Sequence, residues 1–357
     1  MVRVFTDQGL MNRYAYPKGL FANNFGEGDV GVYFTPNFKG EFAKGEISGQ
    51  ISINSKGCRD YEREYEGQGK FRILALGDSF TFGHGIEFEE SFLTILETSL
   101  NLKKDSFEIL KCAVPGGGPR DYLRFLKKEG YKYNPDLVMV NFFLGNDVIT
   151  GDYALANFTK KEKNKATSAK TPLIWKIKNF LKINSQLYGF VVDRIKGQPR
   201  LLKFLVKYGS GLSLGISDTR GLDIMKKHYS EREEKAWDRA FSLLEEIRKL
   251  SKNLLVVAIP SRQQYELTLR ERTADRLGYD LKDFDTHVPN KKLGSFLKKQ
   301  EIYEIDLLNA FEEHYKISGT PLNFQLDAHW NRDGHKFVAS VLFDEMSPIL
   351  DKLVNKQ

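Results

Sequence analysis

Four short segments of this chain carry side chains that could act together on one carbonyl group. They are Gly77-Asp78-Ser79, Val114-Pro115-Gly116, Gly145-Asn146-Asp147 and Asp327-Ala328-His329-Trp330-Asn331. Together they offer a hydroxyl, a glycine N–H, a side-chain amide and an Asp–His pair. Nucleophilic acyl transfer needs these groups: a nucleophile, its base, a group that orients the base, and donors for an oxyanion.

Ser79 is the candidate nucleophile. A serine hydroxyl is a weak nucleophile until a base takes its proton, and His329 can do so because a histidine ordinarily has a pKa of about 6.5. Asp327 would hold the ring in one tautomer and stabilise the imidazolium that forms. The simpler alternatives are that residues 77–79 are a plain strand-to-helix loop and that His329 is an ordinary residue at a helix start.

Three N–H groups are candidate oxyanion donors: the backbone N–H groups of Ser79 and Gly116 and the side-chain amide of Asn146. Glycine at 116 would let the backbone approach the substrate closely. As alternatives, Asn146 could cap a helix, and residues 116–118 could bind phosphate at a helix N-terminus. The phosphate hypothesis is disfavoured because the sequence has neither a Walker-type Gly-Lys-Ser/Thr nor a strand followed by GxGxxG.

The other candidate side chains have competing interpretations. His335 is a rival base but should face the last helix, and His84 is expected to be structural or to line a pocket. Trp330 beside the base could contact substrate by stacking on a sugar ring, or it could pack in the core. The six histidines are scattered and no HExxH occurs, so we expect no metal and no cofactor.

Apolar runs predict the strands that would position these segments. Near-continuous runs are typical of strands covered on both faces, as in a parallel sheet. The expected strands are Phe71–Leu76, Phe107–Cys112, Leu137–Leu144, Leu254–Ile259 and a fifth at Ile302–Leu307. The first three run directly into three of the four segments, so their side chains should meet at one edge of the sheet.

Helical periodicity separates these strands. Apolar residues recur every three to four positions after Gly85, in Ser230–Leu250 and in His335–Leu353. Strands alternating with helices predict an α/β fold with a parallel sheet and helices on both of its faces.

The chain divides into a small N-terminal region and one larger domain. Residues 1–70 are expected to form a β-rich appendage with short strands at Gly31–Phe38 and Glu46–Ile53, and residues 71–357 the main domain. A basic helical insertion at about 151–225 interrupts that domain and is expected to act as a cap or lid. Residues 159–208 hold 13 Lys and Arg against 2 acids, a local net charge of +11 against +7 for the whole chain.

Composition sets further expectations. The two cysteines, Cys58 and Cys112, are far apart and fit neither a disulfide framework nor a zinc site, so Cys112 is expected to be a buried thiol. The chain has no run of 18 apolar residues, and its start lacks the apolar region of a signal peptide. By default we therefore expect a soluble, cytoplasmic protein.

The four segments resemble the SGNH (GDSL-type) hydrolase family. The likeness covers roughly Asn54–Asp147 and Leu254–Leu350 and leaves out the insertion. It implies a three-layer, parallel-sheet, flavodoxin-like sandwich. By matching position it makes Ser79 the nucleophile and Gly116 and Asn146 the oxyanion residues, with Asp327 and His329 as acid and base. The family usually separates the last two by three residues, whereas here they are two apart.

These observations predict a serine-dependent ester hydrolase, carboxylesterase- or lipase-like or a deacetylase, that forms an acyl-enzyme on Ser79. Its partner would be an acyl ester of a lipid or an acetylated glycan. One alternative is an O-acetyltransferase acting on a polysaccharide, since the resemblance includes glycan O-acetyl-modifying enzymes. Another is a non-enzymatic basic binding module, which the pI near 9.0 permits.

The expected partners do not include nucleic acid, because no recognised nucleic-acid-binding fold or aromatic-basic RNA motif occurs in the sequence. The Lys-rich stretch at 160–182 is instead expected to form part of a lid or to contact an anionic surface.

Overall fold

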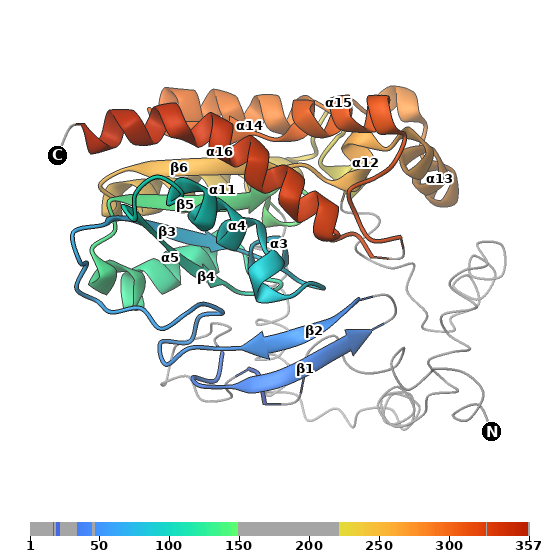
Figure 1. The fold of residues 1–357 in the computed structure, drawn as a ribbon. Helices are drawn as coiled ribbons and strands as arrows, with labels where there is room; N and C mark the ends of the chain where they lie inside the picture. The colour runs from blue at the N-terminus through green and yellow to red at the C-terminus, as the bar shows by residue number, and fades with distance from the viewer. Residues whose placement is uncertain are drawn as a thin grey trace, which may run out of the picture.

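A five-stranded parallel sheet forms the centre of the molecule in the computed structural model (Figure 1). The structure describes residues 17, 19–21, 34–44, 47–148, 221–325 and 327–355. The strands of the central sheet are β3 (Phe71–Gly77), β4 (Phe107–Ala113), β5 (Leu137–Phe143), β6 (Leu254–Ile259) and β7 (Tyr303–Asp306). All five expected strands are thus present, with ends shifted by a few residues at most.

The strand order is β4-β3-β5-β6-β7, and every neighbouring pair is parallel. Numbered along the chain this is the order 2-1-3-4-5, which is the flavodoxin-like arrangement. Every residue of β3 and β6 is buried, as their apolar runs predict for strands covered on both faces. The predicted α/β class with a parallel sheet is confirmed.

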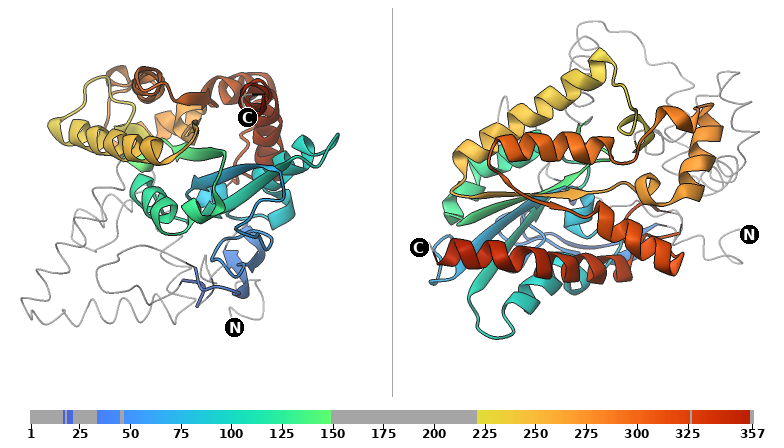
Figure 2. Two further views of the ribbon diagram at one scale, coloured as in Figure 1. Left: turned by 90° about the vertical axis from the view of Figure 1, so that its left-hand side faces the viewer. Right: turned by 90° about the horizontal axis from the view of Figure 1, so that it is seen from above.

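Helices cover both faces of the sheet, and two buried clusters form the core. On one face α4 (Phe92–Leu100), α15 (Leu308–Ser318) and α16 (Arg332–Val354) pack against the strands. On the other lie α5 (Pro119–Lys128), α11 (Glu231–Leu250) and α14 (Val288–Lys299). Figure 2 shows the two helical layers from two further directions.

The periodic patterns place α4, α11 and α16 correctly, but several elements were not predicted. A four-residue helix that was not predicted, α3 (Ser79–Phe82), begins at the candidate nucleophile. The unpredicted elements between β6 and β7 are α12 (Arg262–Tyr265), α13 (Leu267–Leu277), η3 (Leu281–Asp283) and α14. The remaining short elements are η1 (Phe88–Glu90) and η2 (Gly130–Tyr133).

The N-terminal region contains an antiparallel hairpin of β1 (Lys39–Lys44) and β2 (Ile47–Ser52). The second strand lies where we expected it. The first does not, because the pairing runs through Lys39–Lys44; in the described part of the expected strand, 34–38, Phe34 makes an isolated bridge to Phe21. The hairpin packs on the main domain in part through the Phe42 ring, which stacks on His84 at 5.8 Å.

The expectation for the cysteines is wrong, because Cys58 and Cys112 form a disulfide. Asp60 accepts a hydrogen bond at 3.1 Å from the backbone N–H of Lys111, so the segment before β3 lies along β4 and brings the two cysteines together. Their Cα atoms are 4.8 Å apart although 54 positions separate them in the sequence. The separation of two cysteines along the sequence does not indicate whether they are in contact in the fold.

The predicted insertion lies almost wholly outside the described residues, as does the Lys-rich stretch at 160–182. Its lid and surface-contact roles therefore stay predictions. Within the described ranges, no helix combines the length and the apolar character needed to cross a membrane.

Candidate active site

Ser79 is the first residue of α3, two positions after β3 ends at Gly77. A Cβ atom at Gly77 would lie 2.0 Å from the Thr81 hydroxyl oxygen, so the turn into α3 has room only for glycine. Asp78 caps the helix, because its carboxylate accepts the backbone N–H of Phe80 at 3.0 Å. The strand end and the cap together fix the position of the serine.

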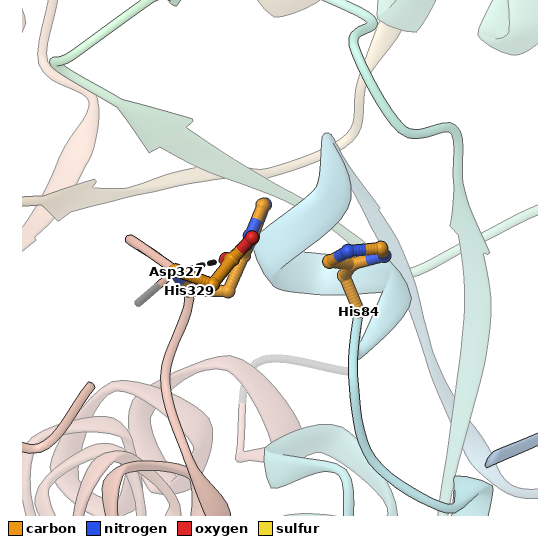
Figure 3. Close-up of side chains that lie close together, drawn as sticks. All are labelled: His84, Asp327 and His329. Atoms are coloured by element: carbon orange, nitrogen blue, oxygen red, sulfur yellow. Dashed lines mark hydrogen bonds and ion pairs between the residues drawn. The ribbon is translucent and has the colours of Figure 1, made fainter. Parts of the chain in front are cut away.

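The three predicted triad residues lie in contact. The Nε2 atom of His329 is 2.7 Å from the Ser79 hydroxyl oxygen, across 250 positions of sequence. The Nδ1 atom of His329 pairs with the Asp327 carboxylate (Figure 3). The same Asp327 oxygen also accepts the backbone N–H of His329 at 2.9 Å. This tight turn explains how a spacing of two residues still lets the aspartate reach the ring.

The electrostatics of the pair favour an ionised aspartate. Burial alone would raise the pKa of Asp327, but the hydrogen bond and charge of His329 hold that pKa well below its usual range. The side chains of Asp327 and His329 are 27% and 21% exposed, so both groups remain accessible from solvent. An ionised carboxylate on Nδ1 leaves Nε2 to accept the serine proton.

The loops of the predicted oxyanion donors lie at the same edge of the sheet. Asn146 follows β5, and its side-chain amide donates to the Asp78 carboxylate at 3.0 Å. Gly116 follows β4, is exposed and has a φ of +75°, a conformation that favours glycine. The N–H of Val114 donates to the Gly77 carbonyl at 3.0 Å, which ties this loop to the nucleophile turn. The role of these groups as oxyanion donors stays a prediction.

Two buried carboxyl groups lie behind the nucleophile. Burial raises the pKa of Asp78 to about 6, although several hydrogen bonds act in the opposite direction. Burial, with the nearby charge of Asp78, also raises the pKa of Asp147 well above its ordinary value. The Tyr122 hydroxyl donates to Asp147 at 2.9 Å. We predicted no role for either acid, because each is an ordinary loop residue by type and lies next to a stronger candidate, Ser79 or Asn146.

Two candidates from the sequence have structural roles here. The rival base His335 is 1% exposed, and its Nδ1 accepts the Phe92 N–H at 3.2 Å. Burial lowers the pKa of His335 to about 3. Trp330 is 0% exposed and packs against Phe80 and Phe92. Trp330 therefore has the expected core-packing role, which was the alternative to substrate contact.

His84 lies closer to the triad than its place in the sequence indicates. It follows α3, is 4% exposed, and its ring centroid is 4.5 Å from that of His329. His84, Asp327 and His329 each present one atom able to bind a metal, and these atoms all lie within 4.8 Å of one another. No sequence motif indicates this cluster, because its members come from two distant segments.

No protein-family model matches the chain, and no curated protein matches it in sequence. Solved structures overlap with it at low identity. TesA has a TM-score of 0.41 and 10% identity, over 78% of this chain and 98% of that one. A catalytic mutant of Axe2, an acetylxylan esterase from Geobacillus stearothermophilus, has a TM-score of 0.41 and 13% identity, over 80% and 97%.

A member of the lipolytic protein G-D-S-L family from Veillonella parvula has a TM-score of 0.38 and 12% identity, over 76% of this chain and 96% of that one. Overlap at this level does not carry an activity from one protein to another. The function proposed below is therefore argued from the side chains of the site.

Proposed function

We propose that this protein is a serine-dependent ester hydrolase of the SGNH type. The observation that carries the proposal is the continuous chain of contacts from the Asp327 carboxylate through the His329 ring to the Ser79 hydroxyl, with a 2.7 Å contact at the serine. A serine so placed next to an aspartate-oriented imidazole is equipped for attack on a carbonyl carbon.

In the proposed reaction His329 takes the Ser79 proton as the hydroxyl attacks the ester carbonyl. The resulting oxyanion would accept hydrogen bonds from the N–H groups of Ser79 and Gly116 and from the Asn146 amide. His329 would then give its proton to the departing alcohol, which leaves an acyl group on Ser79. A water molecule, deprotonated by the same ring, would release the acid and restore the serine.

The substrate we propose is an acyl ester, either of a lipid or of an acetylated glycan. Transfer of an acetyl group to a polysaccharide hydroxyl would use the same triad. The residue that could favour transfer is Trp330, if its ring stacked on a sugar. Because that side chain is fully buried, it offers no surface for stacking on a sugar ring, and hydrolysis is the reaction that we propose. Comparing acetate release with acetyl transfer to an added oligosaccharide separates the two reactions.

Replacing the nucleophile is the direct test. We expect Ser79→Ala to lower kcat for short p-nitrophenyl esters by more than ~10³-fold, and to abolish labelling by a fluorophosphonate. Ser295→Ala, at an exposed serine on α14, is the matched control and should keep both properties. Circular dichroism confirms that both variants are folded. An active Ser79→Ala enzyme would refute the proposed function.

A further inference from the structure

His84, Asp327 and His329 form a cluster, here called the triad-side cluster, with the donor set of a zinc site. Two imidazoles and a carboxylate, with water in the fourth position, are a common three-ligand set for Zn²⁺. Figure 3 shows Asp327 and His329 on the loop before α16 and His84 on the separate segment that follows α3. Two segments distant in sequence therefore meet to form the cluster.

The distances suit a metal after a small adjustment of the side chains. One donor atom from each residue lies within 4.8 Å of the other two. Donors around a tetrahedral Zn²⁺ with bonds of about 2.1 Å are roughly 3.4 Å apart, so side-chain rotations that move the donors by about 1 Å would close the site. Nitrogen donors also discriminate against Mg²⁺ and Ca²⁺, which prefer oxygen ligands.

The packing holds two parts of the cluster differently. The His84 ring contacts the rings of Phe42 and His329 and is almost completely buried, so its position is defined by its neighbours. Asp327 and His329 are partly exposed, so an ion can reach them from solvent. A fixed inner ligand with two accessible outer ligands is an arrangement that can capture an ion without unfolding.

We propose that the triad-side cluster binds Zn²⁺ and that the bound ion switches off the active site. His329 uses one ring nitrogen for Asp327 and the other for Ser79. An ion on the first nitrogen removes the aspartate from the ring, and an ion on the second removes the base from the serine. Inhibition rests on the proposed function, whereas binding of the metal does not.

Four proteins test the proposal: the wild type, Ser79→Ala, His84→Phe and His287→Phe. Phenylalanine at 84 keeps an aromatic ring in contact with Phe42 and His329 and removes the nitrogen donors. His287 is the control, because it also pairs with a carboxylate, Glu312 at 3.4 Å, but lies in another part of the fold. Zn²⁺ binding is measured by competition with a chromophoric chelator at pH 7.5, a readout that needs no activity.

We expect one Zn²⁺ per chain in the wild type, Ser79→Ala and His287→Phe, and an affinity at least tenfold weaker in His84→Phe. The second readout is the Zn²⁺ concentration that halves the rate of p-nitrophenyl acetate hydrolysis, relative to the same protein without metal. This concentration should be at least tenfold higher for His84→Phe than for the wild type, and EDTA should restore the wild-type rate. Equal affinity in His84→Phe and wild type, or bound Zn²⁺ without inhibition of an active enzyme, would overturn the proposal. A wild type that binds Zn²⁺ but hydrolyses no ester would instead refute only the proposed function.

Discussion

At the scale of single residues, the contact between Asp78 and Asn146 defines the direction of a predicted oxyanion donor. Asp78 uses one carboxylate oxygen for the Phe80 N–H and the other for the Asn146 amide, both at 3.0 Å. Two acceptor oxygens therefore face two donors. The Asp78 carboxylate accepts both hydrogen bonds at once. The Asn146 side chain must therefore turn its NH₂ group, and not its oxygen, toward Asp78.

We predict that Asp78→Asn lowers kcat by ~10²–10³-fold with little change in KM, the typical effect of losing one oxyanion donor. The new side chain has one acceptor and one donor. If its oxygen keeps the Phe80 N–H, its NH₂ group opposes that of Asn146, which must turn its amide over. Steady-state kinetics with p-nitrophenyl acetate measures both parameters.

The matched control is Asp306→Asn at the end of β7. Asp306 accepts the Asn290 amide at 2.7 Å and the Leu308 N–H at 3.0 Å, the same kinds of partner as Asp78 has, but away from the triad. It should keep kcat within about threefold, as expected for a substitution that acts only on stability. In an Asn146→Ala background, Asp78→Asn should add little further loss, because both changes remove the same donor. Full additivity would show that Asp78 acts independently of Asn146.

At the scale of elements, residues 54–63 bind the N-terminal region to the active-site side of the sheet. Arg59 is buried and donates to the carbonyl oxygens of Phe82 and Gly83, both at 2.9 Å, at the end of α3. Arg63 pairs with Glu97 at 2.9 Å, and Lys111 pairs with Asp60 at 3.3 Å. Arg63 therefore belongs to a partly buried ion-pair network.

The disulfide between Cys58 and Cys112 reinforces this attachment. Cross-linking a loop of this length removes chain entropy from the unfolded state worth about 4 kcal/mol in the simplest model. We predict that Cys58→Ser with Cys112→Ser lowers the free energy of unfolding by ~2–4 kcal/mol, measured by urea denaturation. Reduced wild type should match the double variant, and an unchanged midpoint would contradict the prediction.

The same disulfide bears on where the protein works. Disulfides persist in oxidising compartments and are rare in a reducing cytoplasm. The bond between Cys58 and Cys112 therefore argues against the cytoplasmic location expected by default from the sequence.

At the scale of the whole molecule, buried titratable groups tie stability to pH. His335 has a folded-state pKa of about 3, lowered by burial and by the charges of Arg59 and His329, against an ordinary value of 6.5. Above pH 6.5 the ring is neutral in both states and its stabilising contribution is complete. Between pH 6.5 and about 3 only the unfolded chain takes up the proton, so that contribution is lost as the pH falls.

We predict that the wild type loses up to about 1.4 kcal/mol of unfolding free energy per pH unit through His335 between pH 6.5 and 5. His335→Asn keeps an acceptor near the Phe92 N–H and cannot titrate. The variant should therefore start from a lower Tm at pH 7.5, but its Tm should fall less steeply with pH than that of the wild type. Tm is measured at pH 7.5, 6.5, 5.5 and 5. Asp78 works in the opposite direction, because its raised pKa favours the folded state as the pH falls through about 6. Parallel curves for the two proteins would rule out His335 as the source.

The sequence by itself determined the parallel α/β architecture and the candidate triad. Apolar runs such as Leu254–Ile259 are buried completely, and burial of apolar surface is the dominant favourable term in folding. Ser79, Asp327 and His329 could be named because strand ends in a parallel sheet meet at one edge and because few residue types activate a hydroxyl. Local periodicity and chemistry were sufficient for both.

Only the tertiary structure decided the contacts between segments that are distant in the chain. Burial, pairing and pKa depend on which surfaces meet, and no local pattern encodes that. In the folded protein Cys58 is bonded to Cys112, and Trp330 and His335 are buried in the core. Asp78 orients the Asn146 amide through a hydrogen bond, and the His84 ring lies against that of His329. The structural role of each of these residues follows from a partner that folding supplies.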